Sequence, residues 1–529
     1  MSSRRAGGRV ARKALRAAPL PSEDQPVRPG LTSGRFLPLE ATDLDRIHGT
    51  ILDLLEDVGF SRSIPSCIEA VTSVGGVFRD GRLTLPRALV EDTIASACRD
   101  FTLFAQDPEW DLTLSGSRVH FGTAGAAVHV VDDWKTHDAY PGKGLYREST
   151  ALDLYDAARL VDRLEHLHFF QRCMVARDIE DPRLMDLNTV YASVSGTRKH
   201  CGVSFVDPEH AREGLKLLHT IAGSEEKWRE RPFASLSCCF VVPPMRFAED
   251  ACRVMEVCIR GGMPVLLLAA GQAGATSPAS LGGSVVQEWA EVLGALVYAN
   301  AIVPGHPCIC GPWPFVSDLR TGAMSGGSGE QAVLMAACGQ MGRYYDLPTG
   351  IAAGMADAKI PDAQSGYEKA YTLTLAGHSG ANLVYESAGM QASLLGFSFE
   401  GCTLDNDMMG AINRTVRGVE VDEDSLALDT IRDVCINGPE HFLGHQATLS
   451  RMQKDYVYPD IGDRLTPAEW IGLGAEPAEV RSRRKTQEIL ESHFPSHIPD
   501  PIDDEIRSRF DIRIPREKMK PVKPSEETT

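Results

Sequence analysis

One unit repeats through the middle of the chain: a short apolar segment, a loop and a longer amphipathic segment. Short apolar runs bounded by glycine or proline indicate buried strands, and the longer segments have the length and spacing of helices. Strands that alternate with helices are parallel and are joined by right-handed crossovers. Seven strands are predicted, at residues 166–171, 200–205, 233–238, 265–270, 307–310, 350–354 and 381–386.

An eighth strand is available at residues 118–131 or at residues 398–404. Eight strand–helix units favour a closed (β/α)8 TIM barrel, expected over residues 118–404. A doubly wound open sheet is the alternative that the same alternation allows. The helices between the strands are predicted at residues 208–222, 247–260, 284–301, 330–344 and 366–377.

The barrel is expected to carry helical additions at both ends. Residues 35–117 form a helical lead-in, and residues 405–515 form a C-terminal helical region that packs on the barrel, with helices at 426–435, 439–452 and 477–493. Residues 1–34 are expected to be a disordered basic tail, and residues 516–529 a polar tail. No apolar segment follows the basic start, which excludes a secretory signal, and no apolar run reaches the roughly 18 residues of a membrane span.

The charge and the cysteines limit the class of protein. With 54 Lys and Arg against 72 Asp and Glu, the net charge is −18, which argues against nucleic acid as a partner. The 13 cysteines are scattered through apolar segments without a C-x-x-C pair, so we expect reduced thiols in the cytoplasm rather than disulfides. No residue pattern predicts a metal site.

The stretch that follows the strand at 307–310 is a long loop with Trp313, Phe315 and a cluster of glycines, and it leads into a helix rich in small residues. Loops of this kind carry the active sites of α/β barrels. A phosphate cradle would need a Lys-Ser/Thr pair or a G-x-G-x-x-G in register, and neither is present. Close backbone packing is therefore the favoured reason for the glycines.

In a barrel, function lies at the carboxyl ends of the strands. Aromatic rings with a nearby carboxylate are what a quaternary or tertiary ammonium group requires. The alternative is that the rings belong to the core and that Glu386 pairs with Lys359 or Arg343. The residues at the predicted strand ends are Gln171, Arg172, Ser204, Phe205, Gln272, Trp313, Phe315, Asp357, Lys359, Tyr385 and Glu386.

Several motifs resemble the trimethylamine methyltransferase superfamily. The resemblance extends from about residue 38 to residue 515. The motifs are Gly-Ala-Thr-Ser-Pro at 274–278, Gly-Glu-Gln-Ala-Val-Leu at 329–334, Arg-Tyr-Tyr-Asp-Leu-Pro at 343–348, the segment 357–369, Leu-Asp-Asn-Asp at 404–407 and Val-Arg-Gly at 416–418.

The resemblance implies a TIM-barrel enzyme that moves a methyl group from a methylated amine to the cobalt of a separate corrinoid protein. Some members carry pyrrolysine in a Pro-Glu-x-Ala-Leu context, and here Gln331 stands at that position. The departure disfavours trimethylamine and points to members without pyrrolysine, which use glycine betaine and related betaines. A quaternary nitrogen leaves as a neutral amine, so the protein needs to orient the substrate and stabilise its charge rather than supply a proton.

We therefore expect a cytoplasmic, homo-oligomeric methyltransferase that demethylates a quaternary ammonium compound. Cobalamin would be supplied by the corrinoid-binding partner, and no tightly bound cofactor is expected. One rival is a folate-linked methyltransferase without a corrinoid partner, and another is a catalytically silent betaine-binding protein. Gln331 and Glu386 are the expected catalytic residues, and the expected substrate-binding residues are Trp313, Phe315, Tyr385, Asp357 and Glu330.

Overall fold

The computed structural model describes residues 37–131, 145–419, 421–438, 440–443, 445–451 and 455–521. The basic tail expected at residues 1–34 lies outside these ranges. Most of the polar tail expected at residues 516–529 does too, although its first residues form the short helix η6 (Arg516–Met519).

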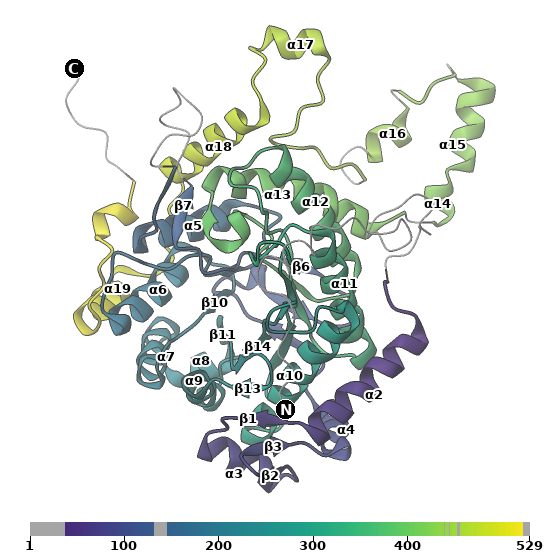
Figure 1. The fold of residues 1–529 in the computed structure, drawn as a ribbon. Helices are drawn as coiled ribbons and strands as arrows, with labels where there is room; N and C mark the ends of the chain where they lie inside the picture. The colour runs from purple at the N-terminus through teal and green to yellow at the C-terminus, as the bar shows by residue number, and fades with distance from the viewer. Residues whose placement is uncertain are drawn as a thin grey trace.

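Eight parallel strands form a closed barrel at the centre of the molecule, with helices around it (Figure 1). One sheet has the order β16-β14-β11-β10-β9 and another the order β18-β19-β6. Two parallel bridges, Gly122 to Phe169 and Cys310 to Thr349, join these sheets at both edges and close the ring. The strands in chain order are β6 (His120–Phe121), β9 (Phe170–Gln171), β10 (Cys201–Val203), β11 (Ala234–Cys238), β14 (Val265–Ala269), β16 (Cys308–Pro312), β18 (Gly350–Ala352) and β19 (Leu383–Tyr385).

The barrel predicted from the strand–helix alternation is confirmed. All seven predicted strands are present, and the segment 118–131 supplies the eighth as β6. The alternative at residues 398–404 is wrong, because Ser398 caps a helix by accepting from the Gly401 N–H. The outer helices are α5 (Ala151–Arg163), α6 (Pro182–Gly196), α7 (Pro208–Ala222), α9 (Glu249–Arg260), α10 (Leu281–Ile302), α11 (Gly329–Tyr345), α12 (Ala363–His378) and α13 (Phe399–Arg417).

The last barrel helix, α13, extends beyond residue 404, where the barrel was expected to end. Two other short helices belong to this part of the fold, α8 (Glu225–Glu230) before β11 and η4 (Ala392–Leu394) after β19. The strands are apolar and buried because helices cover the outside of the barrel and side chains fill its inside.

The N-terminal region, purple in Figure 1, packs against one side of the barrel. Its helices α2 (Ala41–Asp57), α3 (Pro65–Ser73) and α4 (Arg87–Ser96) contact α10. The lead-in is less helical than expected. It also contains β1 (Phe60–Ser61), β2 (Val77–Arg79), β3 (Arg82–Thr84), β4 (Phe101–Leu103), η2 (Pro108–Trp110) and β5 (Leu112–Leu114), and β1 to β3 form a five-stranded sheet with β12 (Val241–Val242) and β13 (Arg246–Phe247).

After α13 the chain leaves the barrel and forms a segment that ends before α18, here called the excursion, and it then returns to the barrel (Figure 1). Helix α18 (Ala478–Ser492), predicted at 477–493, packs on α13 and α5, and α19 (Asp500–Arg509) packs on α7. The helix predicted at 426–435 is interrupted at Ala427, whose φ is +53°, a left-handed value that ends the helix. The excursion contains α14 (Glu423–Leu426), α15 (Leu428–Arg432), η5 (Asp433–Asn437), α16 (Gln446–Arg451) and α17 (Pro467–Gly472).

The helix predicted at 439–452 is shorter than expected. Residues 440–443 are not helical, and α16 begins at Gln446; positions 439, 444 and 452 lie outside the described residues. Among the helices of the described ranges, none has both the length and the apolar character needed to cross a bilayer.

Candidate functional site

The carboxyl ends of the eight strands meet at one end of the barrel, here called the mouth. Trp313 follows β16 and Glu386 follows β19, so both lie at this end, as the strand register predicted. Loops extend the barrel there. Strands β15 (Gln272–Ala273) and β17 (Phe315–Val316) pair in parallel, and β7 (His129–Val131), β8 (Tyr146–Glu148), β20 (Met390–Gln391) and β21 (Gly396–Phe397) form a four-stranded sheet.

A wall of aromatic rings packs inside the barrel next to the mouth, and two of its rings, Trp313 and Tyr385, belong to the buried core, as the alternative interpretation expected. The Trp313 ring centre is 5.2 Å from that of Tyr385 and 6.5 Å from that of Phe315. The Trp313 indole Nε1–H donates to the Gly350 carbonyl at 2.9 Å, which fixes the ring, and Trp313 and Tyr385 are buried while Phe315 is half-buried. The three predicted ring residues are therefore brought together, and Phe169 adds a fourth ring 5.0 Å from Tyr385.

Glu386 is a buried carboxyl group that has no counter-ion among the described residues. Only 2% of the residue is exposed, and its Oε2 has no hydrogen-bond partner. Burial raises the pKa of Glu386 to about 8. Its φ of +62° is unusual for a residue with a side chain, and strained backbone of this kind is common at functional sites.

The expected alternative for Glu386, an ion pair with Lys359 or Arg343, is contradicted. Lys359 is exposed and donates from Nζ to the carbonyl of Asp357. Arg343 is exposed and packs its side chain against Gly380. Within the described ranges, neither side chain forms an ion pair with Glu386.

Gln331 lies in the first turn of α11, which begins at the mouth. It is 1% exposed, and within the part of the chain that the structure describes neither its Oε1 nor its Nε2 has a hydrogen-bond partner. Buried amide groups are nearly always hydrogen-bonded, and an unpaired one indicates a ligand or a water molecule in the site. Glu330, the neighbouring predicted residue, is exposed to solvent.

The Asp357 carboxylate joins two loops through hydrogen bonds. Its Oδ2 accepts from the Ser325 hydroxyl at 2.6 Å, and its Oδ1 accepts from the Gly326 N–H at 2.8 Å and from the Ser393 hydroxyl. These donors come from the loops after β17 and β20. Asp357 thus joins the loops that follow β16 and β19. The hydrogen-bond donors to its carboxylate come from these loops and not from the aromatic residues.

The glycines of the loop before α11 pack as predicted. A Cβ on Gly326 would lie 2.8 Å from the Cβ of Met355, and a Cβ on Gly327 would lie 2.6 Å from the Glu368 carboxyl carbon. Glu368 in turn accepts from the N–H groups of Asp357 and Ala358 at 2.7 and 3.2 Å. These two positions require glycine because the loop backbone lies close to Met355 and Glu368.

The motif residues Lys369 and Asp405 form a buried ion pair behind the mouth. The distance from Lys369 Nζ to Asp405 Oδ2 is 2.6 Å, and the two side chains are 0% and 6% exposed. Asp405 Oδ2 also accepts from the N–H of Gly389 at 2.8 Å, three residues after Glu386. The pair therefore holds the segment that carries Glu386.

Two further side chains, those of Arg172 and Cys239, follow barrel strands at the mouth. Arg172, after β9, is half-buried and donates from Nε to the Ser204 hydroxyl at 2.5 Å. Cys239, after β11, is exposed. Although Cys239 is open to solvent, desolvation by the protein around it raises the pKa of its thiol; the Arg172 guanidinium lowers that pKa and the Glu386 carboxylate raises it. Arg172 was identified as a strand end from the sequence, whereas Cys239 was missed because its apolar neighbourhood is typical of a core cysteine.

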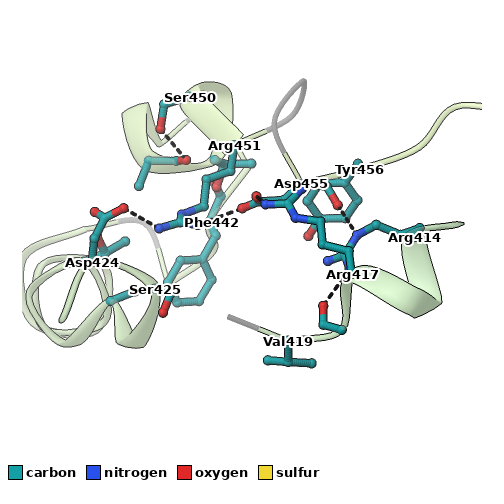
Figure 2. Close-up of a pocket in the computed structure, with 15 residues that line it drawn as sticks. Arg414, Arg417, Val419, Asp424, Ser425, Phe442, Ser450, Arg451, Asp455 and Tyr456 are labelled. Carbon is teal, nitrogen blue, oxygen red and sulfur yellow. Dashed lines mark hydrogen bonds and ion pairs between the residues drawn. The ribbon is translucent and has the colours of Figure 1, made fainter. Parts of the chain in front are cut away.

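A separate hollow of about 560 Å³ lies away from the mouth, between the end of α13 and the excursion (Figure 2). Its arginines are already paired. Arg451 bridges Asp424 and Asp455 at 2.5 and 2.7 Å, and Arg414 donates to the carbonyls of Asp455 and Gly418. These bonds hold the excursion to α13, which gives the hollow a structural explanation.

The sequence profile described as "Trimethylamine methyltransferase (MTTB)" matches residues 5–517. The chain belongs to this family. It is 30% identical over 473 residues to "Trimethylamine methyltransferase MttB" of Desulfitobacterium hafniense, covering 88% of this chain and 92% of that protein. It is 28% identical over 480 residues to "Glycine betaine methyltransferase" of the same species, covering 90% of this chain and 97% of that protein.

The fold of this trimethylamine methyltransferase family member also has a counterpart among solved structures. The monomethylamine methyltransferase MtmB of Methanosarcina barkeri superposes with a TM-score of 0.51 at 12% identity, covering 87% of this chain and 90% of that one. The family predicted from the motifs is confirmed. The prediction that the chain is a methyltransferase is confirmed as well. No group of three or more His, Cys, Asp or Glu side chains able to hold a metal occurs in the part of the chain that the structure describes.

Proposed function

We propose that this chain binds a quaternary ammonium compound, glycine betaine or a related betaine, at the barrel mouth and transfers one methyl group to a separate corrinoid protein. The observation that carries the proposal is the buried Glu386, whose Oε2 is unpaired among the described residues and which directly follows Tyr385 of the ring wall. A quaternary nitrogen has no N–H to donate, so ring faces and a carboxylate are the groups that can stabilise it.

The electrostatics of the site favour a cation. Without a ligand, burial keeps Glu386 largely protonated at neutral pH, because its pKa is raised to about 8. A cation nearby stabilises the carboxylate and lowers that pKa. Binding of the ammonium group and loss of the Glu386 proton are thus coupled, and the bound site holds a cation, an anion and ring faces with water excluded.

Gln331, which stands at the position of pyrrolysine in other members, is compatible with a substrate whose nitrogen is already quaternary. Gln331 offers a neutral amide whose donor and acceptor are both free. Such a group can hydrogen-bond a polar part of the substrate or a water molecule, but it cannot form an adduct with a tertiary amine as pyrrolysine is thought to do. The comparison with glycine betaine methyltransferase, at 28% identity, supports this choice of substrate class.

The corrinoid of the partner supplies a nucleophilic cobalt that accepts the methyl group. The mouth fits a protein partner because its loops carry exposed apolar side chains: Val206 after β10, Leu319 after β17, Tyr367 at the start of α12 and Leu395 after β20 are 53–59% exposed. Exposed apolar side chains that surround a site are typical of a docking face. This chain's own residues orient the cation and exclude water.

The test uses the purified chain with a reduced corrinoid-binding protein and with glycine betaine, choline or trimethylamine as donor. Methylation of the corrinoid is followed by its absorbance, and the demethylated amine is quantified. We expect transfer from a quaternary donor and little from trimethylamine. Transfer to tetrahydrofolate without any corrinoid would establish the folate-linked alternative, and binding without product would establish the silent binding protein.

A further inference from the structure

Arg172 lies at the mouth with most of its hydrogen-bonding capacity unused. Its Nε donates to Ser204 Oγ at 2.5 Å, which orients the guanidinium. Across the described residues, the two terminal nitrogens of Arg172 have no hydrogen bond and no ion pair, although the side chain is half-buried. A guanidinium that is held by Nε and free at its other two nitrogens presents a fork that matches a carboxylate.

A carboxylate that could compete for Arg172 is already engaged. Burial lowers the pKa of Arg172, and Cys239 and Asp186, the latter on α6, act against that lowering. However, Asp186 Oδ2 accepts from the Val206 N–H at 2.9 Å and from His210 Nδ1 at 2.8 Å rather than from Arg172. The fork therefore remains free for a ligand.

The strand order places Arg172 across the mouth from Trp313. Around the closed ring the order is β6, β9, β10, β11, β14, β16, β18, β19. Strands four places apart lie on opposite sides, so Arg172 after β9 faces Trp313 after β16. Cys239 after β11 likewise faces Glu386 after β19.

Cys239 lies at a strand end two places from that of Arg172 and opposite that of Glu386. Its thiol is within electrostatic reach of both Arg172 and Glu386, which shift its pKa in opposite directions after the larger effect of burial. Glu386, after β19, is two strands from β9 and two from β16, so its strand end lies between those of Arg172 and Trp313 around the ring. The cationic Arg172 and the acidic Glu386 therefore occupy different strand ends of the same mouth.

We propose that Arg172 binds the carboxylate of a zwitterionic substrate whose quaternary ammonium group lies against Glu386 and Trp313. The substrate class is then a betaine rather than choline or another quaternary amine without an acid group. This inference rests on the proposed function and deepens it. Arg172 is here a specificity-determining residue, and Ser204 is the residue that positions it.

The experiment measures the affinities of glycine betaine, choline and tetramethylammonium by calorimetry for the full chain and three variants. In Arg172→Gln the fork is lost, and we expect glycine betaine to bind about 10- to 100-fold more weakly, or about 1.4–2.8 kcal/mol. Choline and tetramethylammonium, which lack the carboxylate, should change by less than about twofold. Arg172→Lys retains a point charge and should fall between the wild type and Arg172→Gln.

The control is Arg320→Gln, which removes an exposed arginine from the loop after β17, where it pairs with Asp318 at 2.7 Å. It should leave all three affinities unchanged, which excludes a general effect of net charge. Melting temperatures identify any variant that has lost its fold, and Arg172→Lys keeps the test valid if Arg172→Gln is unstable.

The possible results separate this inference from the proposed function. Unaltered betaine affinity in Arg172→Gln, or an equal loss for choline, would overturn the role of Arg172 while leaving methyl transfer intact. A wild-type chain that transfers methyl groups from choline in preference to glycine betaine would also overturn it. A chain that transfers methyl groups from none of these donors to any corrinoid protein would instead refute the proposed function.

Discussion

Glu386→Gln separates a cation-binding carboxylate from a structural one, because the substitution keeps size and polarity and removes only the charge. The side chain is 2% exposed, its Oε2 is unpaired, and burial raises its pKa to about 8 from an ordinary value of 4.5. The buried carboxylate therefore costs the folded state stability whenever it is ionised. Glutamine carries no such cost.

The sign of the pH effect follows from the raised pKa. Between about pH 4.5 and pH 8 the folded chain keeps a proton on Glu386 that the unfolded chain has lost. The free energy of unfolding of the wild type therefore falls as pH rises through this window. At about 1.4 kcal/mol per pKa unit, the advantage of Glu386→Gln over the wild type should grow by on the order of 3 kcal/mol between pH 5 and pH 8.

Affinity for the substrate should change with pH in the opposite direction to stability. A cation is stabilised by ionised Glu386, so wild-type affinity for glycine betaine should rise with pH and level off above about pH 8. In Glu386→Gln the affinity should be about 10-fold lower above pH 8 and flat with pH. The assays are denaturant unfolding and calorimetric binding on the same samples across pH 5 to 9.

Glu249→Gln is the matched control, since Glu249 is an exposed glutamate at the start of α9. Neither stability nor affinity should change with it. The reasoning fails if Glu386→Gln is destabilised by several kcal/mol at pH 8 while its folded fraction binds betaine normally. That pair of results would mean that Glu386 has a structural cationic partner.

Three further outcomes are expected. Glycine betaine should slow alkylation of Cys239 by iodoacetamide, measured by peptide mass spectrometry, and leave Cys435 unaffected, because both thiols are exposed but Cys239 alone of the two lies at the mouth; equal rates with and without betaine would place the ligand elsewhere. Trimethylamine should be a poor methyl donor compared with glycine betaine in the corrinoid absorbance assay, since Gln331 cannot replace pyrrolysine; a faster rate with trimethylamine would contradict this. Lys369→Met should lower the free energy of unfolding by about 3–5 kcal/mol, because it leaves Asp405 buried without a counter-ion, and Lys369→Met with Asp405→Leu should be less destabilised than the single variant in urea unfolding.

The amino-acid sequence by itself determined the barrel. Parallel strands buried on both faces must be apolar, and each needs an amphipathic helix to return the chain, so their order is visible as alternation. The ends of these strands also identified the rings and carboxylates of the mouth, including Trp313, Tyr385 and Glu386. The broken helix at Ala427 was not predicted, because a left-handed residue within a helical pattern leaves no periodic signal.

The tertiary structure decided which of the strand-end residues share a space and which are already bonded. Asp357 and Glu386 are both carboxylates after barrel strands, yet Asp357 accepts three hydrogen bonds from neighbouring loops and Glu386 Oε2 accepts none. Arg172 and Cys239 are far apart in sequence and come near each other only because β9 and β11 both pair with β10. Burial, pairing and the resulting pKa depend on neighbours contributed by other strands, and those neighbours exist only once the barrel has formed.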